Sequence, residues 1–144
     1  MQVRFRNIQK SDLKELRGWF SDAELSRRVA FPTDDWFDYV TVGRDSICWL
    51  ALDGDTVIGK LQVDRDEKGG GYIDIAIRPD LRGKGVGAAV LAGFIEGPGA
   101  DYVLLDARIE PDNLASLACF RRCGFDIRST PDEDGMIPAI RQAS

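Results

Sequence analysis

The sequence predicts a mixed α/β domain with about six to seven strands, mostly antiparallel with one parallel pair, flanked by about four helices. Three observations lead to this fold class. Short apolar runs with strand-like alternation recur along the chain, and stretches with helical spacing of apolar residues lie between them. Most links between neighbouring strands are short, which favours antiparallel pairing. The strand–helix–strand unit over residues 72–109 is the exception and predicts a parallel crossover.

The first half of the chain predicts a strand, three helical stretches and a hairpin. VRFRNI alternates apolar and basic residues like a half-buried strand, and Ser11 is expected to cap the helix that follows. A second helical stretch contains Leu25, and Thr33 caps a third. CWLAL and VIGKLQVD predict strands joined at Asp53-Gly54, a strong hairpin signal. Alternation predicts two faces for the second of these strands: Val57, Gly59, Leu61 and Val63 on one, and Lys60, Gln62 and Asp64 on the other.

The second half predicts the parallel unit and a closing strand pair. YIDIAI is a short apolar strand, helical spacing begins at Val86 and stops at Gly97, and YVLLDARI is the next strand. Asn113 opens a helix that ends at Gly124. FDIRS and MIPAIR then pair, with Pro138 at an edge or a bulge because proline donates no ladder hydrogen bond.

Composition excludes several classes of function. The 144 residues suit a single domain, 1–144, and contain no His, which excludes Ser-His-Asp catalysis and almost every catalytic zinc set. A net charge of −5 argues against a nucleic-acid partner. Three Cys suggest reduced thiols, and neither a signal peptide nor an apolar run of membrane-spanning length is present. We therefore expect a cytoplasmic protein without metal, nucleic-acid or membrane partners.

A glycine-rich turn, residues 82–87, separates the first parallel strand from its helix. Its glycines let the backbone approach a bulky anion, and the amides at the start of a helix are free donors. Arg82 and Lys84 add positive charge in an otherwise acidic protein. The turn therefore predicts a pyrophosphate cradle, with a plain glycine-rich connector as the alternative.

Two well-known phosphate motifs fit this turn poorly. No Walker A string occurs in the chain. The dinucleotide string G-x-G-x-x-A is matched by Gly83, Gly85 and Ala88, so a small nucleotide-binding module stays open. However, five residues separate the strand from the first glycine, and the chain is too short for two βαβαβ halves.

Two segments resemble motifs of the GNAT superfamily, the acyl-CoA-dependent N-acetyltransferases. IAIRPDLRGKGVGAAVL resembles the acyl-CoA pyrophosphate motif, [RQ]-x-x-G-x-[GA], through Arg82, Gly85 and Gly87. ARIEPDNLASLACFRRCGF resembles the second motif through Asn113, Ser116 and its final Gly-Phe. The motifs stand in the family's order, about 25 residues apart, and the resemblance covers most of the chain.

The resemblance implies a GNAT-like fold in which the parallel strands splay apart and the pantetheine arm of acetyl-CoA lies between them. Ile75 and Ile77 are the expected backbone partners of that arm. The pyrophosphate is expected on the amides of Arg82, Gly83, Lys84, Gly85, Val86 and Gly87. Asn113 is expected to reach the pantetheine or the acetyl end, with a helix N-cap as its alternative role, and Ser116 has the same two readings.

The implied reaction is direct acetyl transfer to a primary amine in a ternary complex. An alkyl amine has a pKa of about 10.4, so freeing its lone pair at pH 7 costs roughly 4.6 kcal/mol and a base is useful. Asp106 is the preferred base, because the family often has a carboxylate on this strand, and Asp74 is the second candidate. For both, an outward-facing surface residue is the alternative. At the position of Phe120, many members of the family have a Tyr, which donates a proton to the leaving thiolate. Because Phe cannot donate, a non-catalytic acyl-CoA-binding sensor is the alternative function.

The acceptor is expected to be a small-molecule or peptide amine. In the family its site is built from the first two helices and the last strands. The first helical segments carry aromatic and acidic residues that suit a cationic amine, or that serve only as core and surface. An exposed last strand is compatible with a homodimer, and the sequence leaves the acceptor's identity open.

Overall fold

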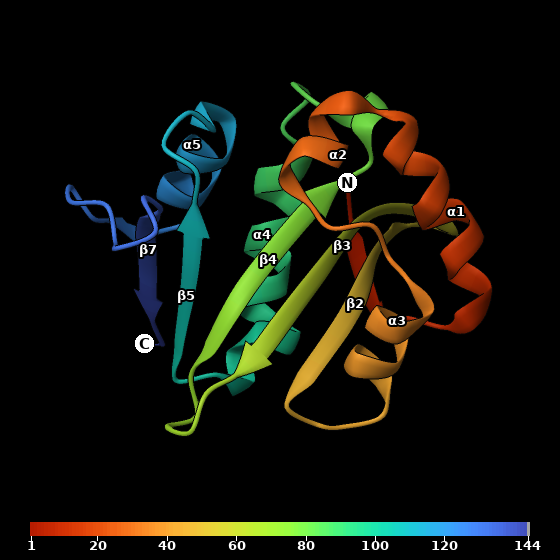
Figure 1. The fold of residues 1–144 in the computed structure, drawn as a ribbon, viewed down its shortest axis with the longest axis horizontal. Coiled ribbons are helices and arrows are strands. Elements are labelled where there is room, and N and C mark those ends of the chain that lie inside the picture. The colour runs from red at the N-terminus through yellow and green to blue at the C-terminus, as the bar shows by residue number, and fades with distance from the viewer. Residues whose placement is uncertain (144) are drawn as a thin grey trace.

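The structure, a computed structural model, describes residues 1–143 and contains a seven-stranded mixed sheet (Figure 1). Its strand order is β1-β2-β3-β4-β5-β7-β6. The strands are β1 (Val3–Asn7), β2 (Ser46–Asp53), β3 (Thr56–Arg65), β4 (Gly71–Ile77), β5 (Leu104–Ile109), β6 (Asp126–Ile127) and β7 (Ile137–Gln142). The α helices are α1 (Leu13–Gly18), α2 (Ala23–Arg28), α3 (Asp34–Thr41), α4 (Val86–Glu96) and α5 (Leu114–Arg122). The predicted mixed α/β class is confirmed, with five α helices in residues 1–143 rather than about four.

Helices cover both faces of the sheet, and each face has its own hydrophobic cluster (Figure 1). On one face α4 and α5 bury Val90, Phe94 and Phe120 against the central strands. On the other face α1, α2 and α3 pack over Leu50 and neighbouring strand residues. The sheet is therefore the middle of three layers.

The N-terminal helices begin differently from each other. Thr33 caps α3 as predicted, because its hydroxyl accepts from the Trp36 amide at 3.1 Å. The prediction that Ser11 caps the first helix is wrong, since residues Lys10–Asp12 form a 3-10 turn and α1 starts at Leu13. The Asp12 carboxylate accepts instead from the Gln9 amide at 2.7 Å and from the Arg6 guanidinium at 2.8 Å. An ion pair to β1 thus fixes this turn.

A bulge in β3 changes the predicted alternation of its side chains. The β2–β3 turn is a two-residue hairpin, as predicted, but its two residues are Gly54 and Asp55 rather than Asp53 and Gly54, and Gly54 has φ 61°. Ala51 pairs with Gly59 and Leu52 with Val57, so Ile58 is the extra residue. Val57 therefore packs among the residues under α1–α3, while Leu61 and Val63 face α4, and the prediction that all three share one face is wrong for Val57.

Strands β4 and β5 are parallel and pair at only two positions, Gly71 with Leu105 and Tyr72 with Asp106. Beyond these pairs the two strands diverge toward their carboxyl ends (Figure 1). Gly71 is required at the vertex, because a Cβ there would overlap the Val63 side chain. The predicted parallel, splayed pair is thus present.

The divergence leaves one backbone edge of β4 facing the gap. Arg78 donates its amide to Ile58 of β3 at 2.9 Å, so even-numbered residues direct their backbone groups toward β3. Ile75 and Ile77 accordingly direct their N–H and C=O groups toward the diverging β5 side.

Pro138 lies inside β7, opposite Arg108 of β5. Its carbonyl accepts from the Arg128 amide at 2.9 Å, so its nitrogen also points to that outer side, away from β5. The ring nitrogen therefore interrupts no bond to β5. The prediction that Pro138 lies at an edge or a bulge is wrong, because β7 lies between β5 and β6 and its register with β5 is continuous at Pro138. The proline is tolerated because the short β6 ends at Ile127, before the residue opposite Pro138.

Candidate functional site

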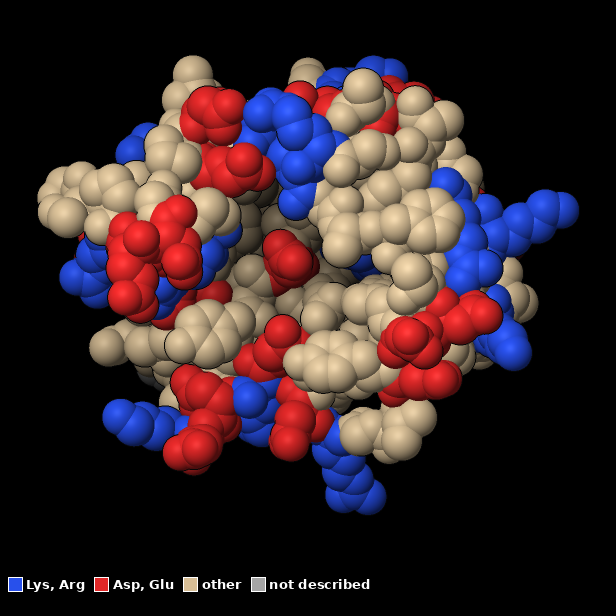
Figure 2. Space-filling model, in the orientation of Figure 1, with Lys and Arg blue, Asp and Glu red and all other residues tan. Residues whose placement is uncertain are grey.

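A cleft of about 520 Å³ occupies the gap between β4 and β5. Its walls come from these two strands, the β5–α5 connection, the first turns of α5 and one side of α2. Figure 2 shows it as a hollow in the face of the molecule, with acidic side chains inside and around it and basic side chains at its upper rim. The volume is within the usual range for small-molecule sites.

The glycine turn reaches the start of α4 with several unused amides. Gly83 and Gly85 have φ 74° and 77°, a left-handed backbone that glycine adopts without strain. Within residues 1–143 no protein group accepts from the amides of residues 83–87, whereas the Arg82 amide donates to Pro79 at 3.3 Å. A Cβ on Gly83 or Gly85 would meet nothing within 4 Å, so this side of the turn is open. The free amides of residues 83–87 could therefore bind a diphosphate. The Arg82 amide, which was also predicted to contact it, already has a protein acceptor.

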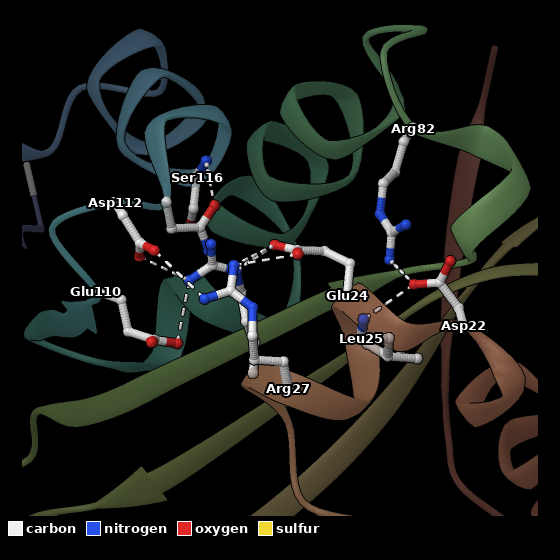
Figure 3. Close-up of polar contacts among 10 residues, drawn as sticks. Asp22, Glu24, Leu25, Arg27, Arg82, Glu110, Asp112 and Ser116 are labelled. Atoms are coloured by element: carbon white, nitrogen blue, oxygen red, sulfur yellow. Dashed lines mark hydrogen bonds and ion pairs between the residues drawn. The ribbon is translucent and has the colours of Figure 1, made fainter.

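The Arg82 side chain connects the glycine turn to α2. Its guanidinium pairs with the Asp22 carboxylate at 2.6 Å, and Asp22 in turn caps α2 by accepting from the Leu25 amide at 2.9 Å (Figure 3). Both hydrogen bonds hold the pKa of the Asp22 carboxyl below its usual range. Lys84 stays exposed at the turn and makes no ion pair within residues 1–143.

The second motif lies across the cleft from β4. Asn113 caps α5, and its side-chain oxygen accepts from the Ser116 amide at 3.3 Å. Asn113 and Ser116 also line the cleft, as do Ile75 and Ile77. The structure thus brings the four predicted pantetheine contacts around one cavity, and their ligand contacts stay a prediction.

A group of five charged residues spans the cleft between α2 and the β5–α5 connection (Figure 3). Arg28 is 12% exposed and pairs with Glu24 at 2.5 Å, Asp112 at 3.1 Å and Glu110 at 3.2 Å. Arg27 adds longer contacts to Glu24 and Asp112 from the solvent side. Together with the Arg82–Asp22 pair, these contacts tether both ends of α2 over the cleft.

Replacing Arg28 by Met should lower Tm by roughly 2–5 °C, because three carboxylates lose the partly buried cation that neutralises them. The matched control is Arg27→Met. Arg27 is 51% exposed, and exposed ion pairs contribute little to stability, so its Tm should change by about 1 °C or less. Thermal unfolding followed by circular dichroism measures both, and equal shifts would contradict the special position of Arg28.

The two candidate bases differ sharply in their surroundings. Asp106 accepts from Nε and Nη2 of Arg108, at 2.9 and 3.0 Å, and the third nitrogen of Arg108, Nη1, donates to Asp132 at 2.8 Å. Asp74 lines the same cleft but makes no hydrogen bond or ion pair with any of residues 1–143. Asp74 is exposed to the cleft, but the protein around it limits its solvation, which raises the pKa of its carboxyl above the usual range; the positive charge of Lys60 opposes that rise. Of the two carboxylates, Asp74 is therefore the one without a protein partner within residues 1–143.

The first helices contribute less to the cleft than the sequence suggested. Of their acidic residues only Glu24 lines it, Trp19 belongs to the core, and Trp36 donates through Nε1 to Gln62 at 2.9 Å. Asp64 and Tyr72 are among the lining residues that were not expected in the site. For Asp64 the sequence does contain a signal, because the alternation of β3 places it on the polar face of the strand.

Residues 1–143 hold no group of three or more His, Cys, Asp or Glu side chains arranged to bind a metal ion. Over the same residues, no helix combines the length and apolarity that crossing a membrane requires.

Comparison with known proteins identifies the family. The model of the "Acetyltransferase (GNAT) family" matches residues 13–125. The chain belongs to the GNAT acetyltransferase family. This GNAT protein is 33% identical over 143 residues to "Uncharacterized N-acetyltransferase YfmK" of Bacillus subtilis, with 95% of each chain covered. It is also 32% identical over 143 residues to a mycothiol acetyltransferase of Mycolicibacterium gilvum, covering 89% of this chain and 42% of that relative.

Solved structures confirm the GNAT fold. An aminoglycoside acetyltransferase, AAC(6')-Ib, in complex with coenzyme A and kanamycin superposes with a TM-score of 0.81 at 20% identity, covering 98% of this chain and 95% of that one. RimL, a ribosomal L7/L12 alpha-N-protein acetyltransferase in complex with coenzyme A, gives 0.81 at 17% identity, with 99% and 94% covered. The two share the architecture with this GNAT protein at low sequence identity.

This GNAT domain has Phe120 where an acid toward the leaving thiolate was expected. Phe120 is buried, lines the cleft and packs edge-on against Phe125 with ring centroids 4.8 Å apart. The neighbouring thiol of Cys119 lies toward Gly87 of α4 and is not among the residues that line the cleft. Burial raises the pKa of the Cys119 thiol to about 11. Within residues 1–143 the place expected for an acid therefore holds a ring without a proton to donate.

Proposed function

We propose that this protein transfers the acetyl group of acetyl-CoA to a primary amine of a cationic small molecule or peptide, with Asp74 as general base. The observation that carries the proposal is the position of Asp74. It is an unpaired carboxylate in the cleft that opens beside the free edge of β4. A carboxylate at such a position is what an incoming ammonium group requires to lose its proton.

The residues present fit acetyl-CoA. The amides of residues 83–87 suit its diphosphate, and the outward backbone groups of Ile75 and Ile77 suit the amides of its pantetheine arm. Asn113 and Ser116 line the opposite wall. When bound, acetyl-CoA supplies a thioester carbonyl that is reactive toward amines.

The proton transfer that the reaction requires favours Asp74 over Asp106 as the base. In the transfer, the amine nitrogen bonds to the acetyl carbon, the carbon–sulfur bond breaks, and the ammonium proton goes to a carboxylate. Asp106 is already held by Arg108 on both oxygens, so its lone pairs are engaged. Asp74 has no such partner within residues 1–143, so its oxygens are free to take the proton. The second amine proton, lost once the nitrogen is acylated, passes through water to the leaving thiolate, because Phe120 has no proton to give.

The charges that line the cleft favour a cationic acceptor. Its three arginines, Arg28, Arg82 and Arg108, are each engaged by carboxylates. Two lining carboxylates, Asp64 and Asp74, form no ion pair within residues 1–143. They are diagonal neighbours on β3 and β4, so two negative charges converge at the floor. Neighbouring folds include a complex with kanamycin, a spermidine N-acetyltransferase and a protein acetyltransferase, which supports an amine acceptor without choosing its class.

The test combines binding with product analysis. Isothermal titration should detect acetyl-CoA and coenzyme A but not NAD. Mass spectrometry should then detect an acetylated product when kanamycin, spermidine or a peptide with a free N-terminus is supplied as the acceptor. Failure to bind acetyl-CoA would contradict the family-based site, and NAD binding would favour a nucleotide-binding module.

Phe120 favours one second candidate, a non-catalytic acyl-CoA-binding sensor. A thiol has a pKa of about 8.5, so releasing it as the thiolate at pH 7 costs only about 2 kcal/mol and activity is expected without a protein acid. Tight acetyl-CoA binding without acetylation of any amine in a broad panel would replace the enzyme proposal by the sensor.

A further inference from the structure

Lys60 is a buried cation beneath the cleft that the proposed reaction does not use. It lies on β3 between Leu50 of β2 and Ala76 of β4, and it is only 8% exposed. Its ammonium lies 4.8 Å from the centre of the Trp36 ring and makes no hydrogen bond or ion pair with residues 1–143. A buried ammonium is costly unless an opposite charge is near.

Strand register places Lys60 beside Asp74. Lys60 pairs with Ala76 and Gln62 pairs with Asp74, so Lys60 and Asp74 are diagonal neighbours on the same face of the sheet. The Gln62 amide group is engaged elsewhere, because Gln62 accepts from Trp36 and donates to Asp64 at 3.0 Å. Gln62 therefore leaves Asp74 without a hydrogen bond, and the charge of Lys60 acts on it directly.

The other charged and titratable groups around this face are engaged with one another or carry no positive charge. They are Cys48 on β2, Asp64 on β3, Tyr72 on β4, Arg82 in the glycine turn, Asp106 and Arg108 on β5, Glu110 after β5, and Glu24 and Arg28 on α2. Arg28, Arg82 and Arg108 are neutralised by their own carboxylates. Lys60 is therefore the cation available to Asp74 within residues 1–143.

We propose that Lys60 is a positioning residue for acetyl transfer: held against Trp36 below the floor of the cleft, its ammonium keeps Asp74 in the carboxylate form that accepts the amine's proton. The proposal rests on the proposed role of Asp74. The effect is reciprocal: burial lowers the pKa of Lys60 and the charge of Asp74 opposes that decrease, while Lys60 opposes the increase at Asp74. Without Lys60, a larger fraction of Asp74 would be protonated at a given pH, and only the carboxylate form accepts the amine's proton.

The test compares Lys60→Met, Lys60→Arg and Lys68→Met. Lys68 is exposed in the β3–β4 connection, so its replacement removes an equal charge far from the floor. The first readout is the Asp74 carboxyl titration in ligand-free protein, followed by carbon-13 NMR and assigned by its loss in Asp74→Asn. Lys60→Met should raise its midpoint by about 0.5–1 pH unit, and Lys60→Arg should restore it. Lys68→Met should leave the midpoint unchanged.

The second readout is the acidic limb of the pH profile of kcat/KM. It should shift in Lys60→Met by the same amount and direction as the NMR midpoint, with rates recovering at high pH. A merely structural role would lower the rate at every pH without moving the limb. If Lys60→Met does not fold, Lys60→Gln keeps a polar side chain of similar length and removes the charge.

The outcomes separate this proposal from the proposed function. An Asp74 midpoint that does not move in the charge-removed variant overturns the role of Lys60, whatever the activity. Full activity in Asp74→Asn overturns Asp74 as the base, and the role of Lys60 in transfer with it, even if the two groups are coupled.

Discussion

Replacing Asp74 by Asn should lower kcat by about 10²–10⁴-fold, the contribution of a positioned general base. The substitution removes the unpaired carboxylate of the cleft and leaves the glycine turn and the edge of β4 unchanged. The affinity for acetyl-CoA should therefore stay within about twofold by isothermal titration. In the natural protein kcat/KM should rise with pH through the raised pKa of Asp74, because the ionised form accepts the proton, and this limb should be absent in the variant.

Asp106→Asn is the matched control, since it makes the same chemical change on the neighbouring strand. It weakens the contact to Arg108 but leaves Asp74 in place, so kcat should fall by less than about tenfold. The opposite ranking, with Asp106→Asn the more damaging variant, would contradict the proposed base and restore the sequence-based preference for Asp106.

Replacing Gly85 by Glu should raise the Kd for acetyl-CoA by at least about 100-fold, an energy of about 2.7 kcal/mol. A side chain at this position meets no protein atom within 4 Å, so the new carboxylate would extend into the open space in front of the free amides. There it would compete with the diphosphate for those amides and repel its charge. Gly85 has φ 77°, so the substitution also costs roughly 1–2 kcal/mol of stability, which a folded domain tolerates.

Gly85→Asn separates charge from backbone strain. Asn is the side chain that most readily adopts a left-handed backbone, and it is neutral. Its Kd should stay within about tenfold of the natural protein. Isothermal titration with circular dichroism as a folding check measures both variants, and an unchanged Kd in Gly85→Glu would refute the diphosphate cradle.

The sequence predicted those features of the fold that depend on neighbouring residues. Thr33 and Asn113 cap helices as expected, and Gly54 forms the expected hairpin turn, because each of these structures is determined within a few residues. The errors arose from distant contacts. Ser11 does not cap a helix because the ion pair of Asp12 with Arg6 of β1 fixes a 3-10 turn at this position, and the β3 bulge depends on pairing with β2.

The candidate site divides in the same way. Its cofactor half could be predicted from the motif, since the amides of residues 83–87 depend on local glycines. The choice of base was missed for a different reason. Arg108 stands two residues after Asp106 on β5 and therefore on the same face, so this ion pair was readable from the spacing. The contact of Arg108 with Asp132 of the β6–β7 connection, and the lack of any partner for Asp74 within residues 1–143, depend on tertiary packing that the sequence does not show.

The short contact between β4 and β5 has a consequence for hydrogen exchange. Ala76 directs its amide to β3, whereas the amides of Ile75 and Ile77 point to the diverging side. Protection against deuterium should therefore alternate along a single central strand of the sheet. A ligand that supplies hydrogen-bond acceptors along this edge would slow deuterium exchange at the amides of Ile75 and Ile77. Exchange at these two amides would therefore measure how much of the cleft is occupied.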